Sequence, residues 1–141
     1  MIDSSSFSKA LGQLSTSLDY LRSDLARGDV GLYRQFRAAT IQAFEFSYEL
    51  AVRMMRRQLR EIAANPAELQ EMGFMDLVRT AADAGLVRDV AGWRTFREMR
   101  NITSHAYDES KAEQVVAGID GFAAECRHLA AELERRNRAS D

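Results

Sequence analysis

The chain has 141 residues, of which 46% are hydrophobic and 28% are charged, as expected for one globular domain with a sizeable core. The formal net charge of −2 excludes a uniformly basic nucleic-acid coat, and the mean hydropathy of −0.33 without a long apolar run excludes a membrane protein. Cys126 is the only cysteine and the N-terminus lacks a secretory signal pattern, so we expect a cytoplasmic protein without disulfides.

The first predicted helix covers residues 5–27. Its apolar residues recur in steps of three and four, so they form one narrow stripe of the kind that packs in a bundle. A second helix should begin near Leu32 and end near Ala64, because Asn65-Pro66 cannot continue it. The apolar stripe expected to face the core of this second helix is Phe36, Ala39, Ala43, Phe46, Leu50 and Met54.

Two aromatic residues of the second helix, Phe44 and Tyr48, lie off this stripe. They are four positions apart and therefore share a helix face. We expect this face to contact either another helix or a second subunit.

The second half of the chain predicts shorter elements. Residues 66–72 should form a loop or short turn, and residues 74–84 a short helix that Gly85 ends. Asp89 can cap the following helix, which should weaken after Arg100 because the next four residues have poorer helix propensity.

A capping box at residues 110–113 predicts the start of the final helix, and residues 135–141 should form a frayed tail. Six apolar residues define the inner face of this helix. The fold class expected for residues 1–141 is therefore all-α, a single domain built as an antiparallel up-and-down bundle of four long helices and one short helix.

The most informative segment is Arg100-Asn101-Ile102-Thr103-Ser104-His105-Ala106-Tyr107. Arginine can bind a phosphate through two parallel hydrogen bonds, and histidine can transfer protons near neutral pH. Cleavage of RNA by a neighbouring 2′-hydroxyl needs a group that transfers a proton and a cation that stabilises the developing charge. In an unbroken helix, residues five apart are rotated by roughly 140°, so convergence needs a helix end near Thr103 or a second subunit. The structural alternative is an ordinary polar helix end.

This segment resembles the motif of the HEPN superfamily, and in particular that of HepT-like toxins encoded beside minimal nucleotidyltransferases. The block at residues 41–51 is similar to the second helix of the branch called nucleotidyltransferase substrate-binding proteins. The resemblance extends from about residue 7 to residue 133. It implies a HEPN-like bundle, a two-fold homodimer that joins two motifs in one cleft, and a cognate minimal nucleotidyltransferase as partner.

The resemblance implies roles for four residues of the motif. Arg100, Asn101 and His105 would be the catalytic residues of a metal-independent endoribonuclease toxin. Tyr107 would accept AMP groups from the partner, which requires an exposed phenol; otherwise it is an ordinary half-buried aromatic residue. The alternative function is a non-enzymatic subunit that binds the partner nucleotidyltransferase or its substrate, so whether the chain is an enzyme stays open.

Further candidate residues lie on the second helix. A cationic stripe could bind RNA or an acidic partner, although such a stripe is often only a solvated face; it consists of Arg53, Arg56, Arg57 and Arg60. Tyr48 is a further candidate for partner binding. Glu45 and Glu49 could position Arg100 or shape a cleft, or serve only in packing. We predict no metal site and no cofactor, because two carboxylates without a third ligand are a weak metal signal and no phosphate-binding loop is present.

Overall fold

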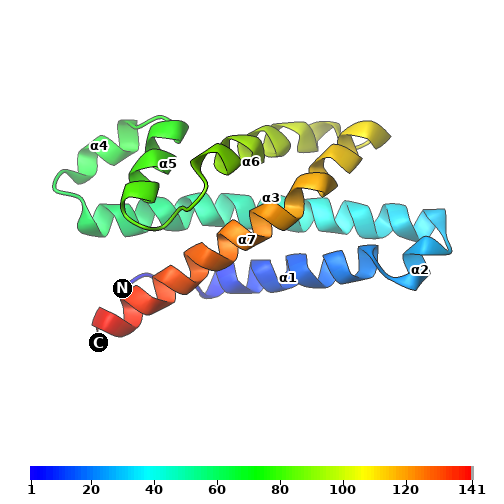
Figure 1. Ribbon diagram of the computed structural model, residues 1–141, viewed down its shortest axis with the longest axis horizontal. Helices are drawn as coiled ribbons and strands as arrows, with labels where there is room; N and C mark the ends of the chain where they lie inside the picture. The colour runs from blue at the N-terminus through cyan, green and yellow to red at the C-terminus, as the bar shows by residue number, and fades with distance from the viewer. Residues whose placement is uncertain (141) are drawn as a thin grey trace.

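A computed structural model describes residues 1–140, and this part of the chain contains helices and no strands. The elements in chain order are α1 (Ser5–Leu21), α2 (Asp24–Arg27), α3 (Val30–Ile62), α4 (Pro66–Glu71), α5 (Phe74–Asp83), α6 (Val90–Ile102), the 3-10 turn η1 (Thr103–His105) and α7 (Glu109–Ser140). Helix α3 is central, with α1 along one side, α6 along the other and α7 crossing obliquely (Figure 1). The prediction of an all-α bundle with four longer helices is confirmed.

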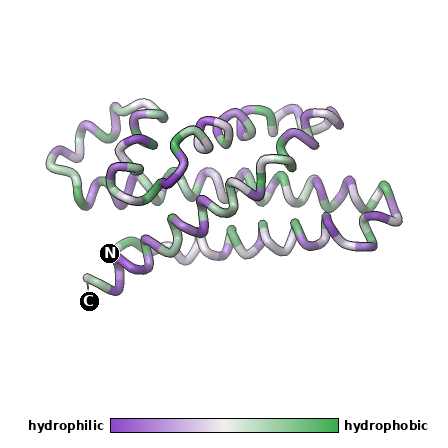
Figure 2. Tube along the Cα trace, viewed as in Figure 1, coloured by the Kyte–Doolittle hydropathy of each residue, from purple (hydrophilic) through white to green (hydrophobic). Residues whose placement is uncertain are grey.

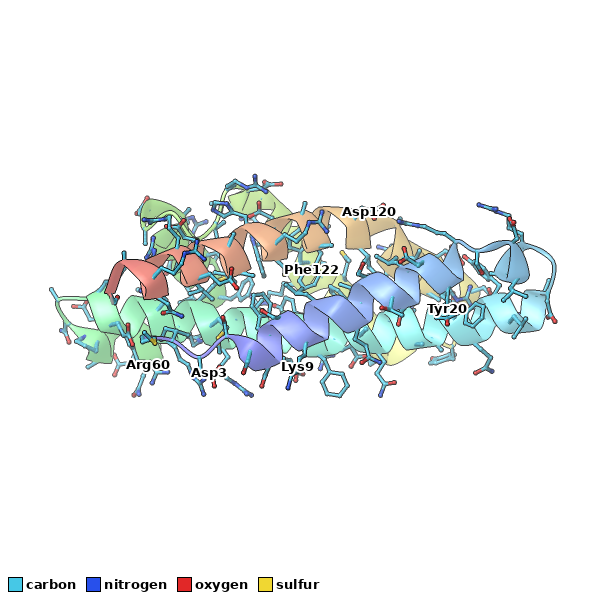
Figure 3. All side chains as sticks on the ribbon, turned by 90° about the horizontal axis from the view of Figure 1, so that it is seen from below. Asp3, Lys9, Tyr20, Arg60, Asp120 and Phe122 are labelled. Carbon is cyan, nitrogen blue, oxygen red and sulfur yellow. The ribbon has the colours of Figure 1, made fainter. Side chains whose placement is uncertain are left out.

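The core forms where the apolar faces of α1, α3, α5, α6 and α7 meet. Along each helix hydrophobic and hydrophilic residues alternate, as an amphipathic helix requires (Figure 2). The predicted inner face of α7 is fully buried and consists of Val115, Ile119, Phe122, Cys126, Leu129 and Leu133. Phe122 lies between α7 and its neighbours (Figure 3), and its ring meets those of Phe44 and Phe96 edge to face at 4.8 and 5.4 Å. This geometry stabilises aromatic pairs beyond their burial.

The prediction of one helix over residues 5–27 is wrong, because the chain breaks after Leu21. Ser23 accepts a hydrogen bond at its Oγ from the Ala26 backbone and so caps a new short helix, α2. The apolar stripe consequently ends with Leu21, and Leu25, an apolar residue of the predicted helix, is 61% exposed.

The predicted inner face of α3 is also wrong in part. Phe46, expected in the core, is 57% exposed, whereas Phe44 and Tyr48 are buried. Phe44 and Tyr48 face other helices of the same chain, because α3 is covered by α1 on one side and by α5, α6 and α7 on others. A helix with neighbours on several sides has more than one apolar stripe, so its periodicity does not single out the buried one.

Three boundaries differ from the sequence expectation. Residues 66–71 form helix α4 rather than a loop, with Pro66 at its first turn, where proline is favourable. Helix α7 begins at Glu109 rather than Ser110, because the Asp108 carboxylate accepts a hydrogen bond from the Lys111 backbone. Helix α7 then continues to Ser140, so residues 135–140 are not frayed; Asp141 lies outside the described residues.

The end of α7 is helical because it is anchored to two other segments. The Asn137 side chain donates to the Ile2 carbonyl at 2.7 Å and accepts from the Ile2 backbone N–H at 3.0 Å. Arg136 donates to the Ala84 carbonyl beside Gly85, whose φ of +84° suits glycine. Within the described residues, no helix is long and apolar enough to cross a membrane.

Candidate functional site

The motif segment lies where α6 ends. The Thr103 Oγ1 donates to the Arg100 carbonyl at 2.7 Å, and the Ser104 Oγ donates to the Asn101 carbonyl at 3.2 Å. These hydroxyls add hydrogen bonds to carbonyls of the last helical turn. The helix therefore changes to the 3-10 turn η1 at Thr103, which is one of the two conditions under which Arg100 and His105 can converge.

The Arg100 guanidinium lies against α3, where two carboxylates bind it. Its Nη2 donates to Glu49 Oε1 at 2.9 Å, and its Nη1 is 3.6 Å from Glu45 Oε2. The Nη1 also donates to the Thr103 Oγ1 at 3.1 Å. The Arg100 side chain remains 33% exposed. Both Glu45 and Glu49 therefore contact Arg100, which is one of the roles considered for them.

His105, Asn101 and Tyr107 point their polar groups to solvent. All three residues are exposed, and Tyr107 is 85% exposed, so the expected exposure of its phenol is confirmed. The His105 and Tyr107 rings are 6.1 Å apart and nearly perpendicular. Within residues 1–140, the contacts of one chain join Arg100 to the two glutamates but include no hydrogen bond between Arg100 and His105.

A buried arginine that sequence analysis missed connects α3 to the start of α7. The Arg37 Nη1 donates to Glu109 Oε2 at 2.7 Å and to Glu113 Oε1 at 2.9 Å, while its side chain is almost wholly buried. The Tyr33 hydroxyl donates to the same Glu113 oxygen at 2.5 Å. The sequence signal was present: Arg37 lies on the face of Thr40 and Phe44, and the two glutamates are four positions apart.

The charges of this cluster shift one another's pKa. Hydrogen bonding to Glu109 raises the pKa of Arg37, and the Arg37 guanidinium in turn lowers the pKa of the Glu109 carboxyl. Arg37 and Glu109 are therefore both charged at neutral pH. The cluster fixes the first turn of α7 on α3, and with it the segment that carries His105 and Tyr107.

A second buried group, Glu125, holds the other end of α6. Its Oε1 accepts hydrogen bonds from the Trp93 Nε1 at 3.1 Å and from the backbone N–H groups of Arg88 and Asp89 at 3.0 and 3.2 Å. Asp89 itself caps α6 by accepting from the Gly92 N–H at 2.9 Å, as predicted. Sequence analysis did not identify Glu125, since nothing in its neighbourhood distinguishes it from an exposed glutamate.

One hollow borders the motif, and a second lies between α1 and α3. A cleft of about 610 Å³ separates the η1 region from α3; its lining is Arg34, Arg37, Ala38, Ile41, Gln42, Glu45, Thr103, Ala106, Tyr107 and Glu109. A groove of about 460 Å³ between α1 and α3 is lined by Lys9, Ala10, Gln13, Ala39, Gln42, Ala43, Phe46 and Leu50. Gln42 lines both hollows, and a smaller hollow next to it is lined by Glu45, Phe46 and Glu49. The exposed Phe46 therefore lies close to the carboxylates that contact Arg100.

Two predicted binding residues on α3 have structural roles instead. Tyr48 is only 9% exposed and stacks on Phe74, so it is not available to RNA or a partner, and burial raises the pKa of its phenol. Arg56 is half-buried and donates to the Leu69 carbonyl at 3.0 Å, which holds α4. The spacing of four arginines along a helix does not indicate which of them makes a hydrogen bond within the chain.

The rest of the stripe is exposed and consists of Arg53, Arg57 and Arg60. Arg60 lies near Asp3, at the end of α3 far from α2 (Figure 3). Arg53, at the other end of the stripe, follows Glu49 by one helical turn. The exposed cations therefore extend along α3 from the neighbourhood of Arg100 toward the N-terminus of the chain.

The sequence and the fold match one known family over nearly the whole chain. Residues 3–135 match the family described as "Nucleotidyltransferase substrate binding protein like". The chain belongs to this family. It is 47% identical over 100 residues to a Haemophilus influenzae protein named "Probable ribonuclease HepT", an alignment that covers 71% of this chain and 68% of the relative.

A solved structure agrees with this assignment. It is a Haemophilus influenzae protein described as having the fold of a substrate binding domain of a nucleotidyltransferase. The superposition has a TM-score of 0.86 with 36% sequence identity, and it covers 91% of this chain and 96% of that protein. The nucleotidyltransferase substrate binding family thus shares the helical architecture described above.

Proposed function

We propose that this member of the nucleotidyltransferase substrate binding family is a HepT-like toxin of the HEPN superfamily, a metal-independent endoribonuclease that its partner nucleotidyltransferase neutralises. The observation that carries the proposal is the end of α6, where a partly exposed Arg100 is followed by an exposed His105. The name of the Haemophilus influenzae relative, a probable ribonuclease, supports the same activity.

In this mechanism the chain supplies proton transfer and charge stabilisation. His105 takes the proton from a 2′-hydroxyl, whose oxygen then attacks the adjacent phosphorus, or delivers a proton to the leaving 5′-oxygen. Arg100 binds the scissile phosphate and stabilises the extra negative charge of the transition state. Asn101, exposed beside Arg100, orients His105 or donates a hydrogen bond to the phosphate.

The proposal includes a two-fold homodimer. The exposed Phe46 projects from a face of α3 where Gln42, Glu45 and Glu49 lie beside it, next to the groove that Lys9 lines. Lys9 is cationic while Glu45 and Glu49 are anionic, so one face carries both signs, and two copies related by a two-fold axis can pair them. Such a dimer brings two motifs together, since Glu49 binds Arg100.

The family description supports a nucleotidyltransferase as partner, and Tyr107 is the proposed acceptor of AMP. Its phenol is free to approach a second active site because it is exposed. Co-expression with the partner followed by intact mass measurement tests the site. We expect a mass increase with ATP and magnesium in the wild type and none in Tyr107→Phe; an equal increase in both would exclude Tyr107.

The decisive experiment for the enzyme is RNA cleavage by the purified protein in EDTA and in magnesium. We expect cleavage in both buffers, and a loss of roughly 100-fold or more in His105→Ala, because that variant lacks the proton-transfer group. The matched control is His128→Ala, since the His128 Nε2 contacts the Gly85 carbonyl on the other side of the bundle. Intact RNA in both buffers, or undiminished cleavage by His105→Ala, would contradict the enzyme.

A second candidate function has its own support. The solved relative is described as a substrate binding domain, so the chain could bind the substrate of a nucleotidyltransferase without cleaving RNA. The exposed cations of α3, Arg53, Arg57 and Arg60, would then serve the partner or its substrate rather than a scissile RNA. Nucleotide binding with no RNA cleavage by the free protein favours this alternative.

A further inference from the structure

We propose that the cleft between η1 and α3 holds an unpaired nucleobase of single-stranded RNA, with the Tyr107 ring as its stacking surface. The cleft has a volume of about 610 Å³, and Tyr107 lies at its rim. The inference rests on the proposed ribonuclease function and specifies how the substrate of that site is held. It gives Tyr107 a role through its ring, which is separate from any modification of its hydroxyl.

The shape and polarity of the cleft suit the face of a base. Ala38, Ile41 and Ala106 contribute its apolar lining, and their small or branched side chains leave space between η1 and α3. Tyr107 is 85% exposed although its ring is large and apolar, so the folded chain leaves the ring uncovered. Aromatic rings that bind single-stranded nucleic acids stack on bases of any sequence in this way.

The charges around the cleft are balanced, which favours a neutral base over a second phosphate. Arg37 is buried and already bound to Glu109 and Glu113. Arg34 is exposed and paired with Glu109 at 3.1 Å. Among the described residues that line the cleft, the two arginines and the two glutamates carry balancing charges, so binding of a base there comes from stacking and hydrogen bonds to the base edge.

The cleft is continuous with the proposed position of the scissile phosphate. Glu45 lines one end of it and is 3.6 Å from the Arg100 guanidinium. A phosphate bound by Arg100 consequently has its neighbouring nucleotide at the mouth of the cleft. From Glu45 to Arg34 the cleft wall follows α3 for about 16 Å, at 1.5 Å of rise per residue.

Gln42 is the polar side chain placed to bind the base edge. It is exposed on α3 and lines the cleft, between Ala38 and Glu45. A carboxamide offers one acceptor and two donors, the combination that pairs with the edge of an adenine. Gln35, also exposed on α3 but outside the cleft lining, is the matched control for this residue.

The test measures binding of a labelled adenosine hexanucleotide RNA to full-length His105→Ala protein, in which cleavage is removed. An abasic RNA of the same length, with identical phosphates, is the companion probe. We expect Tyr107→Ala to weaken binding of the normal RNA between about fivefold and about a hundredfold, and to leave binding of the abasic RNA unchanged. Tyr107→Phe, which keeps the ring, should bind like the parent, and Gln42→Ala but not Gln35→Ala should weaken binding severalfold.

Equal binding of normal and abasic RNA, or equal affinities of Tyr107→Ala and Tyr107→Phe, would overturn the proposal. Because Tyr107 is exposed, loss of folding does not complicate the comparison. AMP is measured as a second ligand: binding of AMP without any binding of RNA would assign the cleft to a free nucleotide instead. If base-dependent binding persists but the wild type does not cleave RNA, the ribonuclease function fails and the subsite does not.

Discussion

The Nη2 of Arg100, on the last turn of α6, donates to the Glu49 carboxylate of α3 at 2.9 Å. With Glu45 also 3.6 Å from the same guanidinium, the charge proposed to bind a phosphate is already neutralised in the free protomer. Exposed ion pairs of this kind contribute only about 0–1 kcal/mol each. An RNA phosphate can therefore displace the carboxylates, but it must compete with them.

Removal of one carboxylate should strengthen RNA binding. In a His105→Ala background, we expect Glu49→Gln to raise the affinity for single-stranded RNA about fivefold at low salt, equivalent to about 1 kcal/mol. The gain should shrink as salt is added, because salt screens exposed charges. Asp120→Asn is the control, since it removes an exposed carboxylate bound to Arg22 at 2.8 Å between α7 and α1. An equal gain in Asp120→Asn would attribute the effect to net charge.

The sequence predicted correctly those helix ends and buried faces that local capping residues and apolar periodicity determine. Asp89 caps α6 and Gly85 ends α5 as predicted, and the six predicted apolar residues of α7 are all buried, although Ala112 and Glu125 of that helix are buried as well. The six recur in regular steps of three and four, so the helical period identifies them. The weak helix propensity after Arg100 likewise predicted that the motif lies at the end of a helix.

The failures arose where distant segments decide the outcome. Phe46 and Phe44 have the same apolar character, and only the packing of neighbouring helices, such as α7 with its Phe122 against Phe44, determines which one is buried. The end of α7 is ordered by Ile2, more than a hundred residues away. Likewise, the ion pair of Arg37 with Glu109 can be predicted only when it is known that α3 lies beside the start of α7. Long-range contacts of this kind leave no periodic trace in a single sequence.

The geometry of Arg100 predicts that lysine cannot replace it. Arg100→Lys keeps the positive charge, but an ammonium group does not provide the planar pair of N–H groups that binds a phosphate at two oxygens. We expect RNA cleavage to fall roughly 10-fold or more. Arg94→Lys on the exposed side of α6 is the control and should cleave normally. Full activity in Arg100→Lys would show that the site needs only a charge.

The buried Arg37 should matter more to stability than its exposed neighbour. Because Arg37 makes two hydrogen bonds to carboxylates, we expect Arg37→Ala to lower the free energy of unfolding by roughly 1.5–3 kcal/mol in urea denaturation. Arg34→Ala, which removes an exposed pair to the same Glu109, should cost about 1 kcal/mol at most. Similar losses in the two variants would contradict a structural role specific to Arg37.

The anchored end of α7 predicts a pH dependence of stability. Hydrogen bonding to Arg135 and Arg136 lowers the pKa of Glu132 from 4.5 to about 2. Between these values the folded chain binds fewer protons at Glu132 than the unfolded chain, so the stabilisation is complete above about 4.5 and lost as the pH falls toward about 2. The stability difference between wild type and Glu132→Gln should therefore shrink over this range.

The comparison for Glu132 is a glutamate on the same helix with a weaker partner. Glu134 is exposed and lies 3.8 Å from Arg138, so Glu134→Gln should match the wild type at every pH. Both variants are measured by urea unfolding at intervals between pH 5 and pH 2. A difference between wild type and Glu132→Gln that stays constant with pH would contradict the coupling.

The exposed phenyl group of Phe46 predicts which surface joins two copies of the chain. We expect the wild type to be a dimer by light scattering at micromolar concentration and Phe46→Glu to be a monomer, because the variant places a charge where apolar surface would be buried. Leu25→Glu is the matched control: Leu25 is similarly exposed, but it lies on α2, away from the groove between α1 and α3. If the motifs of two copies form one cleft, Phe46→Glu should also lose RNA cleavage while keeping its helical content by circular dichroism. A monomeric wild type, or a dimer that Phe46→Glu leaves intact, would contradict the proposed interface, and dissociation by Leu25→Glu alone would move it to α2.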